Sequence, residues 1–149
     1  MPPVERARPE DWPAISGLLS EVSLPLDGAR EAFATGVIAT AATHLAGCAA
    51  IEPFGSAALL RSVAVAPDHR GHGIGRELVA AAEGLARARG ATDLYLLTET
   101  AEPWFGRLGY ERVERSVVPD DVRASVEFEA ACAATAVAMH RVLVQGGGG

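Results

Sequence analysis

Alternating glycines in the middle of the chain form a segment that could bind a phosphate group. The segment reads RGHGIGR over residues 70–76 and follows residues 57–65, an apolar run that predicts a buried strand. Apolar residues at helical spacing begin directly after it and predict a helix over residues 74–89. Glycines let backbone N–H groups turn toward one concavity, and the first N–H groups of a helix lack acceptors within it. The segment therefore favours a phosphate or pyrophosphate site at a helix N-terminus.

Other interpretations of these glycines are open. Arg70 and Arg76 could bind the phosphate through charge-assisted hydrogen bonds, or they could be solvated arginines beside a plain tight turn. A Walker loop requires Gly-Lys-Ser/Thr, whereas Gly75 is followed by Arg76 and Glu77. A dinucleotide fingerprint requires G-x-G-x-x-G, whereas this segment has G-x-G-x-G. The pattern thus argues against ATP and NAD as ligands.

Length and composition predict one globular domain. The chain has 149 residues, of which 49% are hydrophobic and 21% charged, and this is ordinary globular composition. A net charge of −6 argues against nucleic acid as a partner. Cys48 and Cys132 have no metal or redox spacing, so we expect free thiols, no metal and a cytoplasmic location. No signal-peptide or membrane-spanning pattern occurs. We expect a domain over residues 1–145 and a flexible glycine tail over residues 146–149.

Periodicity and turn residues predict an alternation of strands and helices typical of an α/β (α+β) fold. The strand–helix–strand unit around the glycine segment should be parallel and right-handed. The predicted strands are residues 4–8, 36–41, 44–51, 57–65, 93–98, 110–115 and 135–144. A first helix is predicted to begin at residue 9, and four further helices are predicted over residues 27–34, 74–89, 101–108 and 119–131.

The strand LLRSVAVAP, the R-x-x-G-x-G loop and the following helix together resemble the acyl-CoA-binding motif of the GNAT superfamily of N-acetyltransferases. The resemblance implies one GNAT-like domain, with a mixed central sheet of about seven strands flanked by helices and a splayed central parallel strand pair. It also implies acetyl-CoA as co-substrate, with its pyrophosphate on the loop amides and its pantetheine between the splayed strands. The cofactor-binding residues it implies are Val63, Ala64, Val65, Arg70, Gly71, His72, Gly73, Ile74, Gly75, Arg76, Thr98 and Phe105.

Polar residues near the splayed strands are candidates for chemistry on the acceptor amine. Glu52 or Glu99 could take the amine proton through water, and Ser62 lies on the central strand. Arg61 could bind a substrate carboxylate or an oxyanion. The alternative is that both glutamates are solvated and that Arg61 pairs with one of them. The resemblance also places Leu24 and Pro25 in a wall of the acceptor site, although they could simply pack.

The expected general acid is missing. Many GNAT enzymes carry a tyrosine in the pattern A-x-x-F-Y-x-x-x-G-F, where it protonates the departing sulfur. This chain reads AEPWFGRLGY over residues 101–110, so Phe105 stands in the place of that tyrosine, and Tyr110 matches the packing aromatic. Despite this departure, the resemblance as a whole implies an N-acetyltransferase of a small-molecule amine. Two alternatives stay open, a non-catalytic acyl-CoA-binding module and a generic nucleotide-phosphate binder.

A finer resemblance concerns the segment RASVEFEAAC, residues 123–132, which is similar to the tail of an arsenic-resistance N-acetyltransferase-like subgroup. It implies an amino-acid-like arsenical or phosphinic acceptor, with Arg123 and Ser125 among the substrate-binding residues. By analogy with GNAT proteins, the last strand could pair across a homodimer interface. The sequence shows no partner for His44 or His72, and His140 is interpreted as a satisfied structural histidine.

Overall fold

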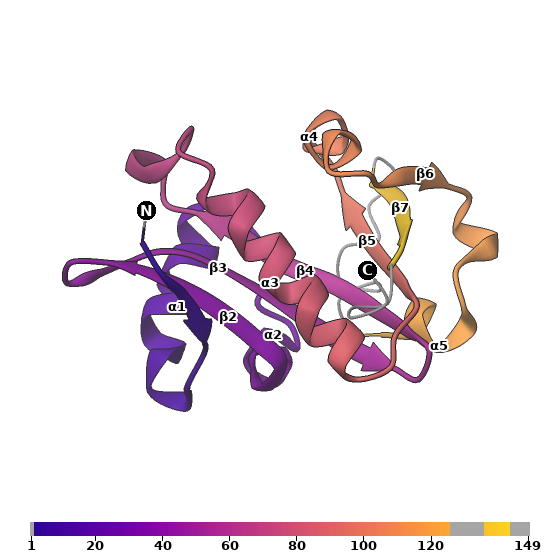
Figure 1. Ribbon diagram of the computed structural model, residues 1–149, viewed down its shortest axis with the longest axis horizontal. Coiled ribbons are helices and arrows are strands. Elements are labelled where there is room, and N and C mark those ends of the chain that lie inside the picture. Colours follow the sequence, from indigo (N-terminus) through magenta and orange to yellow (C-terminus); the bar gives the residue numbers. More distant parts are fainter. Residues whose placement is uncertain (1, 126–135, 144–149) are drawn as a thin grey trace.

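A seven-stranded mixed sheet organises residues 2–125 and 136–143, which are the residues that this computed structural model describes (Figure 1). The strand order is β1-β2-β3-β4-β5-β7-β6. The strands are β1 (Val4–Arg6), β2 (Gly36–Ala41), β3 (His44–Phe54), β4 (Ala57–Val65), β5 (Asp93–Thr98), β6 (Glu111–Val113) and β7 (Val137–Val142). The helices are α1 (Trp12–Glu21), α2 (Ala29–Ala32), α3 (Ile74–Ala88), α4 (Glu102–Arg107) and α5 (Asp120–Arg123), with 3-10 turns at Pro9–Asp11, Phe33–Thr35, Pro67–His69 and Arg115–Val117.

The bounds predicted for β2, β4 and β5 are confirmed, and several others are wrong. β3 runs on to Phe54, and Pro53 pairs with Ala58 beyond the end of β2, where no second neighbour needs its missing N–H. The predicted helix 27–34 is split into α2 and a 3-10 turn, and the predicted strand 110–115 is reduced to β6. Only α5 of the predicted helix 119–131 falls within the described residues, as residues 126–135 and the glycine tail lie outside them.

The central strands β4 and β5 are the one parallel pair in the described sheet, and they separate after a short contact. Their register comprises Ala57↔Asp93, Ala58↔Leu94 and Leu59↔Tyr95, whereas β5 pairs with β7 over its full length. Between Ala64 and Arg61, β4 has two residues opposite the single Ala49 of β3, which is a β-bulge. Ser62 in this bulge has a φ of +57°. Because a bulge bends its strand, it helps to turn the end of β4 away from β5. The expected splayed pair is therefore confirmed.

Alternation along the strands supplies hydrophobic residues to both faces of the sheet. On one face, Val37 and Ile51 pack with Leu78 and Ala82 of α3. On the other face, the intervening Ile38, with Cys48 and Ala50, packs with Ile15 and Leu19 of α1. α5 contributes Val122 to a smaller cluster with Ala57 and Leu59 of β4. Helices thus cover both faces, as the period of two along β2 and β3 requires.

A buried polar network ties α3 to β7 on the α3 face. The carboxylate of Glu83, which is 4% exposed, accepts hydrogen bonds from the Tyr110 hydroxyl at 2.7 Å and from the Arg141 guanidinium at 2.9 Å. Burial, followed by the negative charge of Glu83, raises the pKa of Tyr110 above its ordinary value. Tyr110 is thus a packing residue, as predicted, and its proton stays on the hydroxyl.

Tyr110→Phe is expected to lower the free energy of unfolding by about 1.5–3 kcal/mol, because the buried Glu83 carboxylate loses a donor. Urea denaturation followed by circular dichroism measures the loss. Tyr95→Phe is the matched control, since the hydroxyl of Tyr95 has no hydrogen bond in the described part of the chain. The control should change stability by less than about 0.5 kcal/mol. Equal losses in the two variants would contradict a structural role for the network.

The C-terminal strand differs from the prediction in its place in the sheet. β7 lies between β5 and β6, so it is not the edge strand that pairing across an interface would need, and the homodimer itself stays a prediction. His140 on β7 bonds Asp93 at 2.7 Å, which satisfies this histidine as predicted. This hydrogen bond holds the pKa of Asp93 below its ordinary value. No helix in residues 2–125 and 136–143 has the length and apolar character needed to cross a membrane.

Candidate functional site

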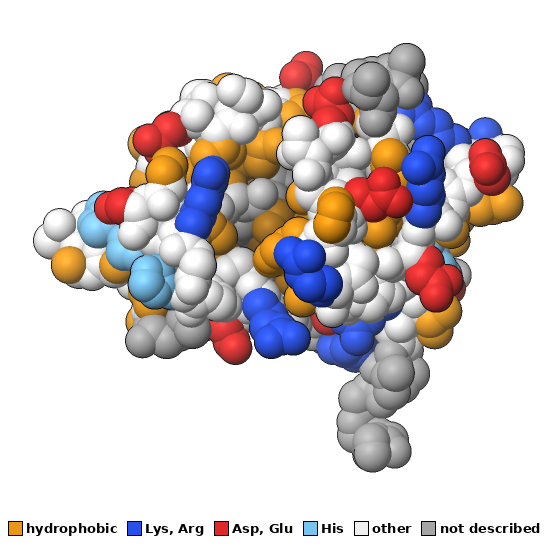
Figure 2. Space-filling view, turned by 90° about the horizontal axis from the view of Figure 1, so that it is seen from above, with side chains coloured by type: hydrophobic (Ala, Val, Ile, Leu, Met, Phe, Trp, Pro, Cys, Tyr) orange, Lys and Arg blue, Asp and Glu red, His pale blue; other side chains and the backbone are white. Residues whose placement is uncertain are grey.

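The diverging ends of β4 and β5 open into a cleft of about 1290 Å³. Its floor and walls come from four parts of the fold. These are residues 60–65 of β4, the glycine loop with the first turn of α3, the end of β5 with α4, and residues 22–26 after α1. Figure 2 shows the opening, with hydrophobic side chains inside it and arginine side chains at its rim. The same cleft is thus lined by the glycine loop and by the polar residues at the end of β5.

The glycine loop has the backbone geometry that a phosphate site needs. Gly71 and Gly73 have φ values of +85° and +81°, in the left-handed region that favours glycine. Gly73 is the N-cap of α3, and the first hydrogen bond of the helix runs from the Glu77 N–H to the Gly73 carbonyl at 3.2 Å. The three preceding N–H groups, of Ile74, Gly75 and Arg76, therefore have no acceptor within the helix. They and the helix dipole can hold an anion at the mouth of the cleft.

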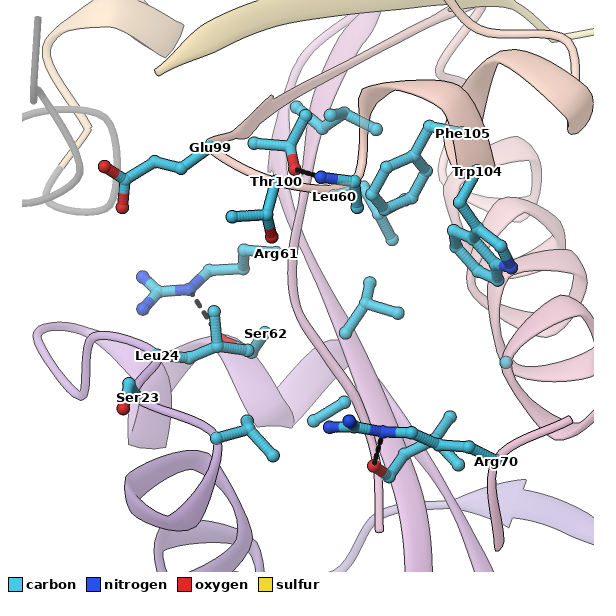
Figure 3. Close-up of a pocket in the computed structure, with 18 of the residues that line it drawn as sticks. Ser23, Leu24, Leu60, Arg61, Ser62, Arg70, Glu99, Thr100, Trp104 and Phe105 are labelled. Carbon is cyan, nitrogen blue, oxygen red and sulfur yellow. Dashed lines mark hydrogen bonds between the residues drawn. The ribbon is translucent and has the colours of Figure 1, made fainter. Parts of the chain in front are cut away.

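Most of the predicted loop residues line the cleft, with one exception. Arg70, Gly71, Gly73, Ile74, Gly75 and Arg76 border it, whereas His72 is exposed and does not. Arg70 Nε donates to the Val65 carbonyl at 3.2 Å, which lays the side chain along the end of β4 (Figure 3). The guanidinium thus lies beside the loop, where it could add a charge-assisted hydrogen bond to a phosphate.

Residues 60–65 of β4 form the inner wall of the cleft. Beyond Leu59 this strand has no β5 partner in the described register, so a ligand that enters between the strands can reach its β5-facing edge, where the Val65 carbonyl also accepts from Arg70 Nε. Val63, Ala64 and Val65 all border the cleft, as predicted. An extended amide-containing chain placed here would bond the free edge as an additional strand does.

Arg61 anchors the wall that we expect to face the acceptor, through its own protein partners. Its side chain is fully buried, with hydrogen bonds from Nη1 to Glu52 Oε2 at 2.9 Å, from Nη2 to the Asp27 carbonyl at 2.7 Å and from Nε to Ser62 Oγ at 3.1 Å. This is the pairing that the sequence left open as the alternative to substrate binding. The Asp27 bond ties the segment after α1 to the central strand. Arg61 thus positions the wall formed by Leu24 and Pro25, which both line the cleft.

Three polar residues end β5 at the same side of the cleft. Thr98, Glu99 and Thr100 all border it. The Thr98 hydroxyl accepts a hydrogen bond from the Ala101 N–H at 3.0 Å, which helps to begin α4. In Figure 3, Glu99, Thr100, Arg61 and Ser62 lie on the side opposite Trp104 and Phe105. The cleft therefore has a polar side and an aromatic side.

The aromatic side carries no tyrosine. Phe105, which is 7% exposed, borders the cleft and packs edge-to-face on Trp104 and Tyr110 at centroid distances of 4.8 and 5.7 Å. Tyr110 and Tyr95 are the two tyrosines of the chain, and neither lines the cleft. Among the cleft residues, hydroxyl groups come instead from serines and threonines, including Ser62 at the bulge.

Other predicted residues lie elsewhere, and several residues that line the cleft were not predicted, Trp104 among them. Glu52 is paired behind Arg61 and does not line the cleft. Arg123 pairs with Asp120 within α5 and Ser125 is buried, and neither lines it. Cys132 lies outside the described residues. Trp104 was missed, although its aromatic type beside Phe105 was a signal. A Cβ added at Gly75 would lie 3.0 Å from the Trp104 ring, so this glycine lets the ring pack on the first turn of α3.

Comparisons with known proteins agree with this geometry. The chain matches the GNAT acetyltransferase domain family over residues 33–112, which include β2 to β5, α3 and α4. It is 35% identical over 79 residues to the amino-acid acetyltransferase of Ralstonia nicotianae, which is 52% of this chain and 18% of that protein. The chain thus spans less than a fifth of the length of this curated relative.

Two solved structures share the fold. N-acetylglutamate synthase from Neisseria gonorrhoeae, complexed with coenzyme A and N-acetyl-glutamate, has a TM-score of 0.82 at 24% identity, covering 97% of this chain and 35% of that chain. Rv2747 from Mycobacterium tuberculosis, in complex with CoA and NLQ, has a TM-score of 0.80 at 25% identity, covering 96% of this chain and 100% of that chain. With more than half of its residues matched by the family, including the glycine loop and the splayed strands, the chain belongs to the GNAT acetyltransferase family.

Proposed function

We propose that this domain transfers the acetyl group of acetyl-CoA to the amine of an amino acid or of an amino-acid-like small molecule. The observation that carries the proposal is the cleft itself, which joins an anion-binding helix N-terminus to an unpaired strand edge and then to a polar pocket. Support comes from the matched relative, which is an amino-acid acetyltransferase, and from a neighbour that was solved with CoA.

The parts of the cleft suggest how the two substrates would bind. The diphosphate of acetyl-CoA would lie on the N–H groups of Ile74, Gly75 and Arg76, beside the Arg70 guanidinium. The pantetheine arm would run along the free edge of residues 63–65. The thioester would then lie at the polar side of the cleft, and the amine would enter along the wall of Leu24 and Pro25.

The chemistry asks for few protein groups. The neutral amine nitrogen attacks the thioester carbon, the C–S bond breaks, and CoA leaves as a thiolate that takes a proton from solvent or from a nearby hydroxyl. Glu99, exposed at the rim, is our candidate for receiving the amine proton through water. Ser62, whose oxygen is held by Arg61, is a candidate hydroxyl donor at the thioester. Glu52 would act only through Arg61, which it holds in place.

Three kinds of acceptor belong to the chemical class that we propose. Amino acids, phosphinic amino acids and amino-acid-like arsenicals share an α-amine and an anionic group. Arg123 and Ser125, expected to bind such an anion, lie away from the cleft lining, and Arg61 is internally paired. Because Arg70 and Arg76 lie at the loop proposed for the diphosphate, a substrate anion on the acceptor side would bond the hydroxyl or backbone donors of the cleft. This leaves the arsenical as one member of the panel to be tested.

A second candidate function is a non-catalytic acyl-CoA-binding module. The observation that favours it is Phe105, since both tyrosines of the chain lie outside the cleft. Such a module would bind acetyl-CoA and would release no CoA with any amine.

Release of free CoA thiol from acetyl-CoA, measured over a panel of amines, tests the proposal. The panel comprises amino acids, their phosphinic and arsenical analogues, polyamines and aminoglycosides, with an amine-free control for hydrolysis. We expect release with α-amino acids or their analogues and background rates with polyamines. Release with aminoglycosides alone would refute the amino-acid assignment. Calorimetric binding of acetyl-CoA without release from any amine would replace the transferase by the binding module.

A further inference from the structure

Two histidines and an aspartate meet beside the cleft. His44 begins β3, and Asp68 and His69 lie in the 3-10 turn that precedes the glycine loop. His44 Nε2 and His69 Nε2 are 2.7 Å apart, and one ligand atom from each of the three side chains lies within 4.8 Å of the others. No partner for His44 can be seen in the sequence, because His69 is 25 residues away and the two meet only through the fold.

Backbone hydrogen bonds hold the two segments that carry these side chains. The hairpin between β2 and β3 pairs Ala41 with His44, and the Ala66 N–H donates to the Ala46 carbonyl at 2.8 Å. The turn itself is closed by the bond from the His69 N–H to the Ala66 carbonyl at 2.9 Å. These bonds fix the backbone around the three ligands, so little backbone conformational entropy would be lost on binding an ion.

The donor set has a specific chemical preference. Two imidazole nitrogens and one carboxylate oxygen suit Zn²⁺, Ni²⁺, Co²⁺ or Cu²⁺, whereas Mg²⁺ and Ca²⁺ prefer oxygen ligands throughout. Two nitrogens bound tetrahedrally to Zn²⁺ at about 2.0–2.1 Å lie about 3.3 Å apart. The two Nε2 atoms would therefore part by about 0.6 Å. His44 and Asp68 are exposed, so they have room to rotate and water can complete the coordination.

The electrostatic surroundings also favour a cation. Asp11 and Glu21 line the same groove of about 650 Å³ that His44 and Asp68 border. No arginine lines this groove among the residues that the structure describes. A divalent ion would thus lie in a groove lined by the carboxylates of Asp11, Glu21 and Asp68, with no arginine in the described lining.

We propose that His44, Asp68 and His69 bind a divalent transition-metal ion, with Zn²⁺ and Ni²⁺ as the probes. The ion links the β2–β3 hairpin to the turn directly before the glycine loop. His69 also borders the acyl-CoA cleft, and Arg70 follows it in the chain. The site is separate from the acyl-transfer residues, so it stands whether or not the domain is a transferase.

The test uses tag-free, chelator-treated protein of the full chain, because a polyhistidine tag would bind the same ions. Calorimetry with ZnCl₂ or NiCl₂ measures affinity and stoichiometry, and a thermal melt with and without the ion measures stabilisation. His44→Ala, Asp68→Asn and His69→Ala remove one ligand each. His72→Ala is the matched control, since His72 is an exposed histidine of the neighbouring loop that is not in the cluster. The parent and all variants carry Cys132→Ser, so that the Cys132 thiol cannot bind the ion. Cys48 needs no substitution, because it is buried and burial raises its pKa to about 12.

We expect one ion per chain in the Cys132→Ser parent and in His72→Ala, together with a rise in melting temperature. Each of the three ligand variants should bind at least about tenfold more weakly and lose the rise, while its melting temperature in chelator stays near that of the parent. Parent-like affinity in His44→Ala and His69→Ala would overturn the site. So would a parent that shows no stoichiometric binding, or a His72→Ala variant that loses it.

Discussion

Gly73→Glu is expected to weaken acetyl-CoA binding by at least about 100-fold while the domain stays folded, which corresponds to about 2.7 kcal/mol of binding free energy. Gly73 is the N-cap of α3, and the free N–H groups of the first turn follow it directly. A glutamate at this position brings a side chain and a negative charge to the place where we expect the diphosphate. Calorimetry with acetyl-CoA measures the loss.

The matched control separates this local effect from backbone strain. Gly55 lies in the turn between β3 and β4 with a φ of +69°, close to the +81° of Gly73, and a Cβ added to it would meet no atom within 4 Å. Gly55→Glu therefore introduces the same residue, the same charge and a comparable left-handed strain of about 1–2 kcal/mol at a distance from the cleft. It should bind acetyl-CoA as the parent does. Retained affinity in a folded Gly73→Glu variant would refute the diphosphate assignment.

Arg61→Met should cause the largest loss of stability, about 3–5 kcal/mol, because it leaves the Glu52 carboxylate and the Asp27 carbonyl without their donor. Arg123→Met is the control, as it removes an arginine of a solvent-exposed ion pair and should cost about 0–1 kcal/mol. Urea denaturation followed by circular dichroism gives both values. The Arg61→Met/Glu52→Met double variant should recover part of the loss, since no unpaired charge is left behind. A double variant no more stable than Arg61→Met would contradict the charge-pair explanation.

Arg61 should also affect function if it positions the acceptor wall. The conservative variant Arg61→Lys keeps the charge and loses the planar fork that reaches Glu52 and Asp27 together. We expect a higher KM for the amine with an unchanged Kd for acetyl-CoA, because the residues that would hold the cofactor are elsewhere in the cleft. A change confined to stability would show that the Asp27 contact does not shape the acceptor side.

The sequence predicted the elements that carry their own local signals. The apolar runs of β2 and β4 and the glycines before α3 are properties of short segments, and the structure has these elements where expected. The splay of β4 from β5 has no such local signal and came from the resemblance. The short register Ala57–Leu59 and the bulge at Ser62 now give it a physical basis.

The contacts that could not be predicted join segments distant in sequence. The Asp27 carbonyl lies 34 residues from Arg61, and His69 lies 25 residues from His44. Strand order is equally non-local, and for this reason an apolar C-terminal strand was mistaken for an edge although β6 covers it. The expected roles of Arg123 and Ser125 rested on a tail pattern, which says nothing about which face of the sheet they occupy.

The short pairing of β4 with β5 divides the sheet into two parts. One part comprises β1 to β4, the other comprises β5 to β7, and three residue pairs form the backbone register between them. A ligand bound between the two parts would supply some of the hydrogen bonds that β4 and β5 do not make with each other. By linkage, acetyl-CoA at about 100 times its Kd would add about 2.7 kcal/mol to the free energy of unfolding. Acetyl-CoA would then stabilise the fold as well as serve as a substrate, and the domain would be most stable when acetyl-CoA is bound.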